Sequence, residues 1–361
     1  MMQQKKVKII TEAGVNHNGN IDLALQLIDV AADAGADAVK FQTFSAAQLV
    51  SLSAPKAAYQ KRTTDSAESQ YDMLKKLELS FEHHFILKAH CEKKNIDFLS
   101  TPFDAISADF LLNQLKLKTI KIASGEIATA PLLLQIAKQD VNIILSTGMS
   151  SLGDIEQALA VIAFGLIQSA EKPSILAFMK AYYSSEGQAK LKEKVTLLHC
   201  TSDYPASFDH INLKAMNTLR SAFGLPVGYS DHSMGIAVPV AAVALGATVI
   251  EKHFTLSRDL PGPDQHASLE PVELKNMVKS IREVELALGN HLKIPTSSEL
   301  ETKLIARKSL VATRLIQKNE ALTENNINMQ RPGNGVPPIH YWDYLEKVAS
   351  KNYEIGELIN E

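Results

Sequence analysis

This 361-residue sequence has few cysteines, a small net charge and no long apolar run. Its two cysteines, Cys91 and Cys200, lie far apart, so a disulfide framework is not expected, and Cys200 is predicted to be a buried, inert thiol. The 37 basic and 40 acidic residues give a net charge of −3 without a long basic run, which argues against nucleic acid as a partner. No apolar run approaches the length that spans a membrane, so no membrane partner is expected.

The start of the chain, MMQQKKVKII, holds two lysines and only a short apolar run. This run is shorter than a signal peptide needs, so it predicts a first strand and a cytoplasmic location. A hydrophobic content of 45% with 21% charged residues is typical of a globular protein. The length exceeds one simple core and favours a large barrel followed by a small domain.

A strand-like run followed by a helical segment recurs along most of the chain. The runs are nearly continuous in apolar residues, which is typical of parallel strands covered on both faces. They are VKIITEAG, AVKFQTF, IDFLSTPF, TIKIASGE, NIILSTGMS, VTLLHCTSDYP, VGYSDHS and TVIEKHF. Eight such units in under 300 residues predict a (β/α)8 barrel over residues 1–290. A doubly wound open sheet is the alternative, but in such a sheet only strands near the switch point would end in reactive side chains.

The seventh and eighth runs each end in a polar cluster. Ser230, Asp231 and His232 close the first, and Glu251 precedes His253 in the second. The segment between them has the length of a crossover helix, so both strands end on the same side of the sheet. His232 and His253 could therefore share one divalent metal ion. Two ordinary histidines, one capping a helix and one packed in the core, remain possible because the spacing fixes no third ligand.

Two lysines lie in the middle of apolar strands, Lys40 in AVKFQ and Lys121 in TIKIAS. A buried ammonium group is costly unless an anion pairs with it. Because Ser124, Ser146 and Ser230 also end strands, the set predicts a site for phosphate and carboxylate groups, in preference to a structural ion pair.

Three segments lie outside this repeat. The loop from about residue 45 to 80 is long enough to form a lid or substrate wall, with a solvated excursion as the alternative. The segment 152–194 holds a surplus apolar piece that could pack on the barrel or on a second subunit. A polar stretch at 291–303 predicts a linker, and short β-like runs at 304–361 predict a small second domain, in which Arg331 stands in the turn RPGNG.

Ten motifs occur in order along the whole chain: EAGVNHNGN, VKFQTF, STPFD, KIASGE, LSTGM, LHCTSDYPA, GYSDHS, EKHFT, GPD and RPGNG. With them the chain resembles the sialic acid synthase family, the bacterial nonulosonic acid synthases. The resemblance covers the barrel and the C-terminal domain, which is similar to the antifreeze-like (SAF, β-clip) domain. It implies a condensation of phosphoenolpyruvate with the open-chain aldehyde of an N-acetylated hexosamine, with C–O cleavage and release of phosphate. It also implies a divalent metal, Mn2+ or Mg2+, and a domain-swapped homodimer.

The resemblance assigns roles residue by residue. His232 and His253 match the metal ligands. Glu12 and Glu126 match active-site carboxylates, and with Lys121 and Glu251 they form the predicted catalytic set. The predicted substrate-binding residues are Lys40, Gln42, Ser124, Ser146, Ser202, Tyr204, Ser230, Asp264 and Arg331. Among these, Arg331 matches an arginine that the second domain inserts into the partner subunit's barrel, where it binds the N-acetyl group.

Two departures from the family pattern concern the sugar. Ser202 stands where neuraminate members often carry Asn, and Gln265 precedes His266 in GPDQHAS. The resemblance therefore leaves two expected sugars, N-acetylmannosamine and a 2,4-diacetamido-6-deoxy-mannose analogue, with N-acetylneuraminate or legionaminate as the product. The APKAAYQ and ESQ stretches are closer to these synthases than to pseudaminate synthases.

Two other classes of protein stay open: a Schiff-base aldolase acting through Lys121, and a non-catalytic sugar- or ice-binding protein.

Overall fold

The computed structural model describes residues 6–57, 60–61, 64–65 and 67–360 of the chain. The chain divides into two compact units, Met1–Gly289 and Asn290–Glu361. Within the described part of the chain, no helix has the length and apolar character needed to cross a membrane.

The first unit is built on eight parallel strands. They are β1 (Lys8–Gly14), β2 (Ala38–Thr43), β3 (Asp97–Pro102), β4 (Thr119–Ile122), β5 (Asn142–Ser146), β6 (Val195–Cys200), β7 (Val227–Asp231) and β8 (Val249–His253). The hydrogen-bonded order is β3-β2-β1-β8-β7-β6-β5-β4, and β3 also contacts β4. The sheet therefore curls into a (β/α)8 barrel, as the sequence predicts, and the open doubly wound alternative is wrong.

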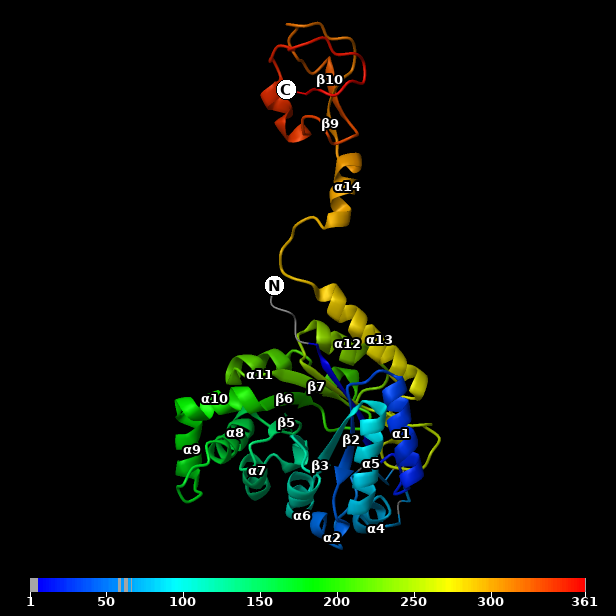
Figure 1. Cartoon of the computed structure of the whole chain (residues 1–361), viewed down its shortest axis with the longest axis vertical. Coiled ribbons are helices and arrows are strands. Elements are labelled where there is room, and N and C mark those ends of the chain that lie inside the picture. The colour runs from blue at the N-terminus through cyan, green and yellow to red at the C-terminus, as the bar shows by residue number, and fades with distance from the viewer. Residues whose placement is uncertain (1–5, 58–59, 62–63, 66, 361) are drawn as a thin grey trace. The chain divides into compact units, whose positions relative to one another are not determined.

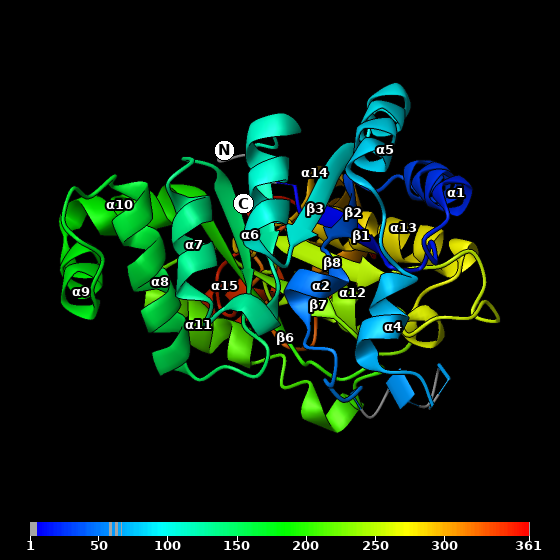
Figure 2. The same ribbon diagram turned by 90° about the horizontal axis from the view of Figure 1, so that it is seen from below.

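Helices cover the outside of these strands (Figures 1 and 2). The main ones are α1 (Ile21–Asp33), α5 (Phe81–Lys94), α6 (Ala105–Asp109) with the π-helical turn Phe110–Gln114, α7 (Ala130–Ala137), α8 (Leu152–Leu166), α11 (Ala215–Phe223), α12 (Ala237–Ala244) and α13 (Pro271–Leu288). In α1 the buried residues Ala24, Leu27, Ile28 and Ala31 recur at three- and four-residue spacing, as an amphipathic helix requires. The Asn20 side chain caps its first turn.

The barrel interior changes from apolar to polar along the strands. One apolar layer near the strand starts is formed by Ile10, Ala38, Leu99, Ile144, Leu198 and Val249. Two residues further along, the same strands carry Glu12, Lys40, Thr101, Ser146, Cys200 and Glu251. Because side chains on a strand alternate between its two faces, this second layer points into the barrel above the apolar plug.

The surplus segment 152–194 packs against its own barrel. It forms α8, then α9 (Ile175–Tyr183) and α10 (Ser185–Lys194), and both additional helices contact α8. The rings of Phe164 and Phe178 lie 5.1 Å apart, edge to face, between α8 and α9. The apolar piece is therefore an extra helix on the barrel surface.

The second unit has its own small core. Two antiparallel strands, β9 (Ser309–Ala312) and β10 (Ile327–Gln330), are joined by turns and followed by the 3-10 turn Pro338–His340 and α15 (Tyr341–Tyr344). Its core consists of Leu310, Ala312, Ile316, Leu322, Ile327, Val336, Ala349, Tyr353 and Ile359. The segment predicted as a plain linker differs from expectation, because α14 (Ser297–Ala306) begins inside it with a capping box between Thr296 and Glu299. The similarity to the antifreeze-like domain stays a prediction.

Candidate active site

A cavity of about 470 Å3 opens at the carboxyl ends of the barrel strands. It brings together all the predicted site residues of the first unit. They are Glu12, Lys40, Gln42, Lys121, Ser124, Glu126, Ser146, Ser202, Tyr204, Ser230, His232, Glu251, His253 and Asp264. In a barrel of this kind, reactive groups lie at this end because the loops after the strands converge there.

The deepest part of the cavity is a network of two lysines and two glutamates. Lys40 forms an ion pair with Glu12 and lies 3.8 Å from Glu251. Lys121 Nζ donates to Glu251 Oε1 at 3.0 Å, and all four side chains are buried. Both lysines thus form ion pairs within the protein, which was the alternative to an anion-binding site. Ion pairing and anion binding are compatible, because an incoming anion could replace a carboxylate as the partner of each lysine.

The two carboxyl groups of this network differ in their affinity for protons. Burial, together with the neighbouring Glu251, raises the pKa of Glu12 to about 7, although Lys40 opposes the rise. Burial also acts to raise the pKa of Glu251, but Lys121 and Lys40 outweigh it and lower the pKa to about 2. Burial would lower the pKa of Lys40, yet Glu12 and Glu251 raise it. One glutamate is therefore a firm anion, and the other can carry a proton near neutral pH.

Hydroxyl groups surround the network. Ser230 Oγ donates to Glu251 Oε1 at 2.9 Å, and Lys40 Nζ donates to Thr101 Oγ1 at 3.1 Å. Ser146 Oγ is buried and makes no hydrogen bond with any described residue. A buried hydroxyl without a partner is costly unless a ligand completes it, so Ser146 marks a place for a ligand oxygen.

Ser124 lies beyond the end of β4, in a 3-10 turn, Ser124–Glu126. Its hydroxyl accepts from the Gly148 backbone N–H at 3.0 Å and lies 3.2 Å from Cys200 Sγ. A Cβ added at Gly148 would stand 2.4 Å from Ser202 Oγ and 2.8 Å from Ser124 Oγ. This close approach is open only to glycine. The thiol of Cys200 is buried, as predicted, but it lines the cavity and is not part of the apolar core.

The two predicted metal-binding histidines are neighbours. The ring centroids of His232 and His253 lie 5.6 Å apart, and the Tyr204 ring lies 4.2 Å from that of His232. His232 Nδ1 lies 2.6 Å from the Thr201 carbonyl oxygen, and since a carbonyl only accepts, Nδ1 is the protonated nitrogen. This contact leaves Nε2 as the basic nitrogen and fixes the ring in place.

These histidines fit a divalent metal ion. Burial lowers the pKa of His232, and burial with the proximity of His232 lowers the pKa of His253 well below its usual value. Both imidazoles are thus neutral, which is the form that binds metal. Buried His253 Nδ1 lacks a hydrogen bond within the described chain, and Asp264 Oδ2 is 3.9 Å away. Among the described residues no group of three or more His, Cys, Asp or Glu side chains could hold a metal, so these two imidazoles would be the main protein ligands.

The remaining predicted residues of the first unit also line the cavity. Glu126 is half-buried, accepts a hydrogen bond from Thr129 Oγ1 at 2.9 Å, and has a pKa raised by burial. Burial also raises the pKa of Asp264, to about 6. Gln42 Nε2 lies 3.4 Å from Glu12 Oε1. Arg331 belongs to the second unit, where its Nε donates to the Ala306 carbonyl at 2.9 Å.

Described residues of the segment after β2 form one wall of the cavity, while contact of this wall with a substrate stays a prediction. It contains α2 (Ala46–Leu49) and α4 (Gln70–Lys75). Its lining residues are Leu49, Val50, Ala57, Gln60, Gln70, Met73, Leu74 and Leu77. No role was predicted for any single wall residue, although Gln60 and Gln70 lie in the APKAAYQ and ESQ stretches. The run IDFLSTPF predicts Thr101 as a polar strand end, and Thr101 lines the cavity two residues after the plug residue Leu99.

A larger cavity of about 740 Å3 lies among α7, α8 and α9 and meets the first at Ser124, Gly125 and Met149. Within the described chain its lining is mostly apolar and contains no lysine or histidine. The predicted lysine, glutamate and histidine groups of the site therefore lie in the smaller cavity.

Comparison with known proteins places this site in a family. The profile of the NeuB family matches residues 27–293. The chain belongs to the NeuB family. It is 50% identical over 357 residues to the N,N'-diacetyllegionaminic acid synthase of Campylobacter jejuni, covering 99% of this chain and 100% of that one. It is 30% identical over 355 residues to the human N-acetylneuraminate-9-phosphate synthase, covering 98% and 91% of the two chains.

A solved structure agrees with this assignment. The N-acetylneuraminic acid synthetase of Leptospira borgpetersenii, in complex with citrate, is 35% identical with a TM-score of 0.66, over 82% of this chain and 90% of that one. This NeuB-family chain is thus an enzyme of the synthase type, and the non-catalytic sugar- or ice-binding alternative is wrong.

Proposed function

We propose that the enzyme condenses phosphoenolpyruvate with an N-acetylated hexosamine to give a nonulosonic acid and phosphate. The observation that carries the proposal is the cavity in which Lys40 and Lys121, Glu12 and Glu251, and His232 lie together. Cationic and hydroxyl groups suit the phosphate and carboxylate of phosphoenolpyruvate, and neutral imidazoles suit a metal ion.

In the proposed reaction, C3 of phosphoenolpyruvate forms a bond to the aldehyde carbon of the open-chain sugar. The aldehyde oxygen takes up a proton, water attacks C2 of the oxocarbenium-like intermediate, and phosphate leaves with cleavage of the C–O bond. Lys40 and Lys121 hold the anionic groups, helped by the hydroxyls of Ser124, Ser146 and Ser230. Glu12 lies beside Gln42 and Lys40, where a carboxyl can hold the proton that the aldehyde oxygen takes up. Glu126 at the cavity mouth is the second proposed acid or base.

A bound Mn2+ or Mg2+ would supply Lewis acidity toward the aldehyde oxygen. His232 and His253 would hold it, with Asp264 beside His253. Tyr204, Ser202 and Gln42 would contact the sugar, because they line the same cavity as the two histidines.

The observed pairing of Lys121 argues against a Schiff-base mechanism. Its Nζ donates to the buried carboxylate of Glu251 at 3.0 Å, and an amine that attacks a carbonyl carbon would have to give up this contact.

The sugar we favour is the 2,4-diacetamido-6-deoxy-mannose analogue. Two N,N'-diacetyllegionaminic acid synthases are 50% and 43% identical to this chain, whereas the human N-acetylneuraminate-9-phosphate synthase is 30% identical. The Ser202 and Gln265 departures agree with a sugar other than N-acetylmannosamine.

Incubation of the enzyme with Mn2+, phosphoenolpyruvate and each candidate sugar, followed by mass spectrometry of the product, tests the proposal. Phosphoenolpyruvate labelled with 18O in the bridging position should give labelled phosphate, because C–O cleavage leaves that oxygen on phosphorus. Lys121→Met is a second test: it keeps the apolar stem, removes the charge, and should raise KM for phosphoenolpyruvate at least tenfold. Unlabelled phosphate, or borohydride trapping of substrate on Lys121, would contradict the mechanism.

We further propose a domain-swapped homodimer in which Arg331 binds the sugar N-acetyl group in the partner's barrel. The support is the family and the exposure of Arg331 in a separate unit. The purified heterodimer of a His253→Ala chain and an Arg331→Ala chain should recover up to about half of wild-type activity, since one of its two barrels then has both groups. The measurement is turnover after co-refolding differently tagged chains and purifying the heterodimer. Purified heterodimers without activity would show that Arg331 serves its own barrel or none.

A further inference from the structure

The wall formed by the segment after β2 differs in chemistry from the rest of the cavity. The barrel end carries lysine, glutamate and histidine side chains. The wall residues are aliphatic side chains and methionine, with two primary amides, Gln60 and Gln70. The part of a ligand that lies against this wall is therefore uncharged, partly apolar and able to pair with an amide.

An acetamido group has these properties. It offers one carbonyl acceptor, one N–H donor and a methyl group, and a glutamine side chain can both accept and donate. A 2,4-diacetamido-6-deoxy sugar carries an acetamido group at C4 and a methyl group at C6, and this methyl suits Met73 and Leu74 better than a hydroxymethyl group would. N-acetylmannosamine has hydroxyl groups at C4 and C6.

Gln70 is the better placed of the two amides. Gln60 Oε1 already accepts from the Ala57 backbone N–H at 2.9 Å. Gln70 Nε2 lies 3.5 Å from Gln60 Oε1, at the limit of a hydrogen bond, and no described residue donates to Gln70 Oε1. The side chain is half-buried at the first position of α4, so a ligand in the cavity can reach it.

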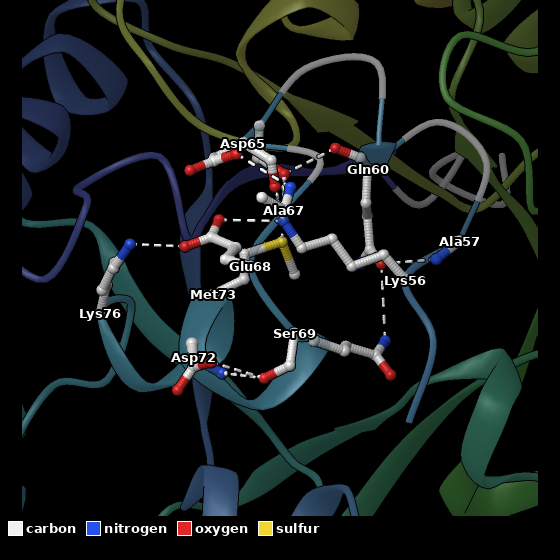
Figure 3. A network of polar contacts seen from close by, with 12 residues as sticks. Lys56, Ala57, Gln60, Asp65, Ala67, Glu68, Ser69, Asp72, Met73 and Lys76 are labelled. Carbon is white, nitrogen blue, oxygen red and sulfur yellow. Dashed lines mark hydrogen bonds and ion pairs between the residues drawn. The ribbon is translucent and has the colours of Figure 1, made fainter. Parts of the chain in front are cut away.

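A buried lysine holds this wall in shape (Figure 3). Lys56 Nζ donates to Thr64 Oγ1 at 2.9 Å, the Asp65 carbonyl at 2.6 Å and Glu68 Oε1 at 3.0 Å, which uses all three of its donors. The other Glu68 oxygen pairs with Lys76 at 2.5 Å. The side chain of Lys56 is only 1% exposed, so this buried network ties the start of the wall to Thr64, Asp65 and Glu68.

The start of α4 is fixed independently. Ser69 Oγ accepts from the Asp72 backbone N–H at 3.1 Å and donates to the Asp72 carboxylate at 2.8 Å. This cap sets the direction in which Gln70 leaves the helix. The amide therefore stands on a braced and capped support, as recognition of a ligand requires.

We infer that Gln70 recognises the second acetamido group of the sugar and so determines the preference for a diacetamido substrate. The inference rests on the proposed function. Lys56 acts as a positioning residue for the wall, through Glu68.

The test compares wild type, Gln70→Leu and the matched control Gln48→Leu, in which the same change is made at an exposed position of α2 outside the cavity. Initial rates are measured with the diacetamido sugar and with N-acetylmannosamine at saturating phosphoenolpyruvate. Gln70→Leu should lower kcat/KM for the diacetamido sugar by about 10- to 100-fold, leave kcat/KM for N-acetylmannosamine within about twofold, and leave KM for phosphoenolpyruvate unchanged. Gln48→Leu should match wild type throughout.

Equal losses for both sugars, or no loss for either, would overturn the role of Gln70 while the condensation stands. A preference of the wild-type enzyme for N-acetylmannosamine would also overturn the role of Gln70 and leave the condensation standing. Wild type that releases no phosphate with either sugar would overturn the proposed function and this inference with it. Gln70→Met replaces Gln70→Leu if the latter does not fold.

Lys56→Met tests the positioning role. It should reduce the preference for the diacetamido sugar about tenfold in the wild-type background and have little further effect on that preference in Gln70→Leu. An equal loss of preference in both backgrounds would show that Lys56 does not act through Gln70.

Discussion

Replacement of His253 by alanine should abolish turnover while the barrel stays folded. We expect a loss of at least about a thousandfold, since polarisation of a carbonyl by a metal contributes several kcal/mol and each 1.4 kcal/mol is tenfold in rate. The side chain lies at the end of β8, above the apolar plug, so its truncation leaves the core intact. Steady-state assays at defined Mn2+ concentration and circular dichroism of the same sample measure the two effects.

His199→Ala is the matched control. His199 lies on β6 of the same barrel, but its Nε2 contacts the Ile211 carbonyl and it does not line the cavity. It should retain turnover within a few-fold of wild type. A chelator should silence wild type, and added Mn2+ should restore it. Substantial activity of His253→Ala at low metal concentration would refute the assigned metal role.

Replacement of Lys252 by methionine should destabilise the protein by about 3–5 kcal/mol, because it leaves a buried carboxylate without its partner. Lys252 and Asp231 are both fully buried, and Lys252 Nζ donates to Asp231 Oδ2 at 2.5 Å and to the Ser233 carbonyl. The pair connects the ends of β7 and β8 on the face opposite His232 and His253, since neighbouring residues of a strand point to opposite faces. The free energy of unfolding in urea is the measurement.

The double variant Lys252→Met with Asp231→Asn separates charge from shape. It should be more stable than Lys252→Met alone, because the uncompensated charge is gone while Tyr229 and Ser233 still hydrogen-bond the Asn oxygen. If the two changes simply add, the electrostatic account of this pair is wrong.

The barrel and the position of its site followed from sequence because both depend on short-range patterns. Eight apolar runs predicted eight strands, and the polar residues at their ends predicted one shared cavity. The partners of Lys40 and Lys121 could not be predicted, because they come from strands one and eight, far away in the sequence. Period-two spacing does place Glu12 and Glu251 on inward faces, but only the barrel closure brings them to the lysines.

Two regions show where such patterns fail. The geometry of the wall after β2 depends on contacts between Lys56 and acceptors 8 to 12 residues away. The APKAAYQ and ESQ stretches contain Gln60 and Gln70, but neither periodicity nor helix caps could place these side chains in the cavity. The expected linker contains α14 because Thr296 and Glu299 form a capping box. That S/T-x-x-E signal was present in the sequence, and the polar composition obscured it.

The apolar layer beneath the polar site has a consequence for the timing of catalysis. Ile10, Ala38, Leu99, Ile144, Leu198 and Val249 close the barrel below the lysines, so the described cavity has the character of a blind well with access from the strand ends. The reactant that meets Lys40 and Lys121 lies at the bottom, and a sugar held by the histidines and the glutamine wall would lie above it. Phosphoenolpyruvate would then have to enter first, and an early-bound sugar would obstruct it. Initial-rate kinetics would show this as an ordered mechanism with substrate inhibition by the sugar, and random-order binding would show a second route to the bottom of the well.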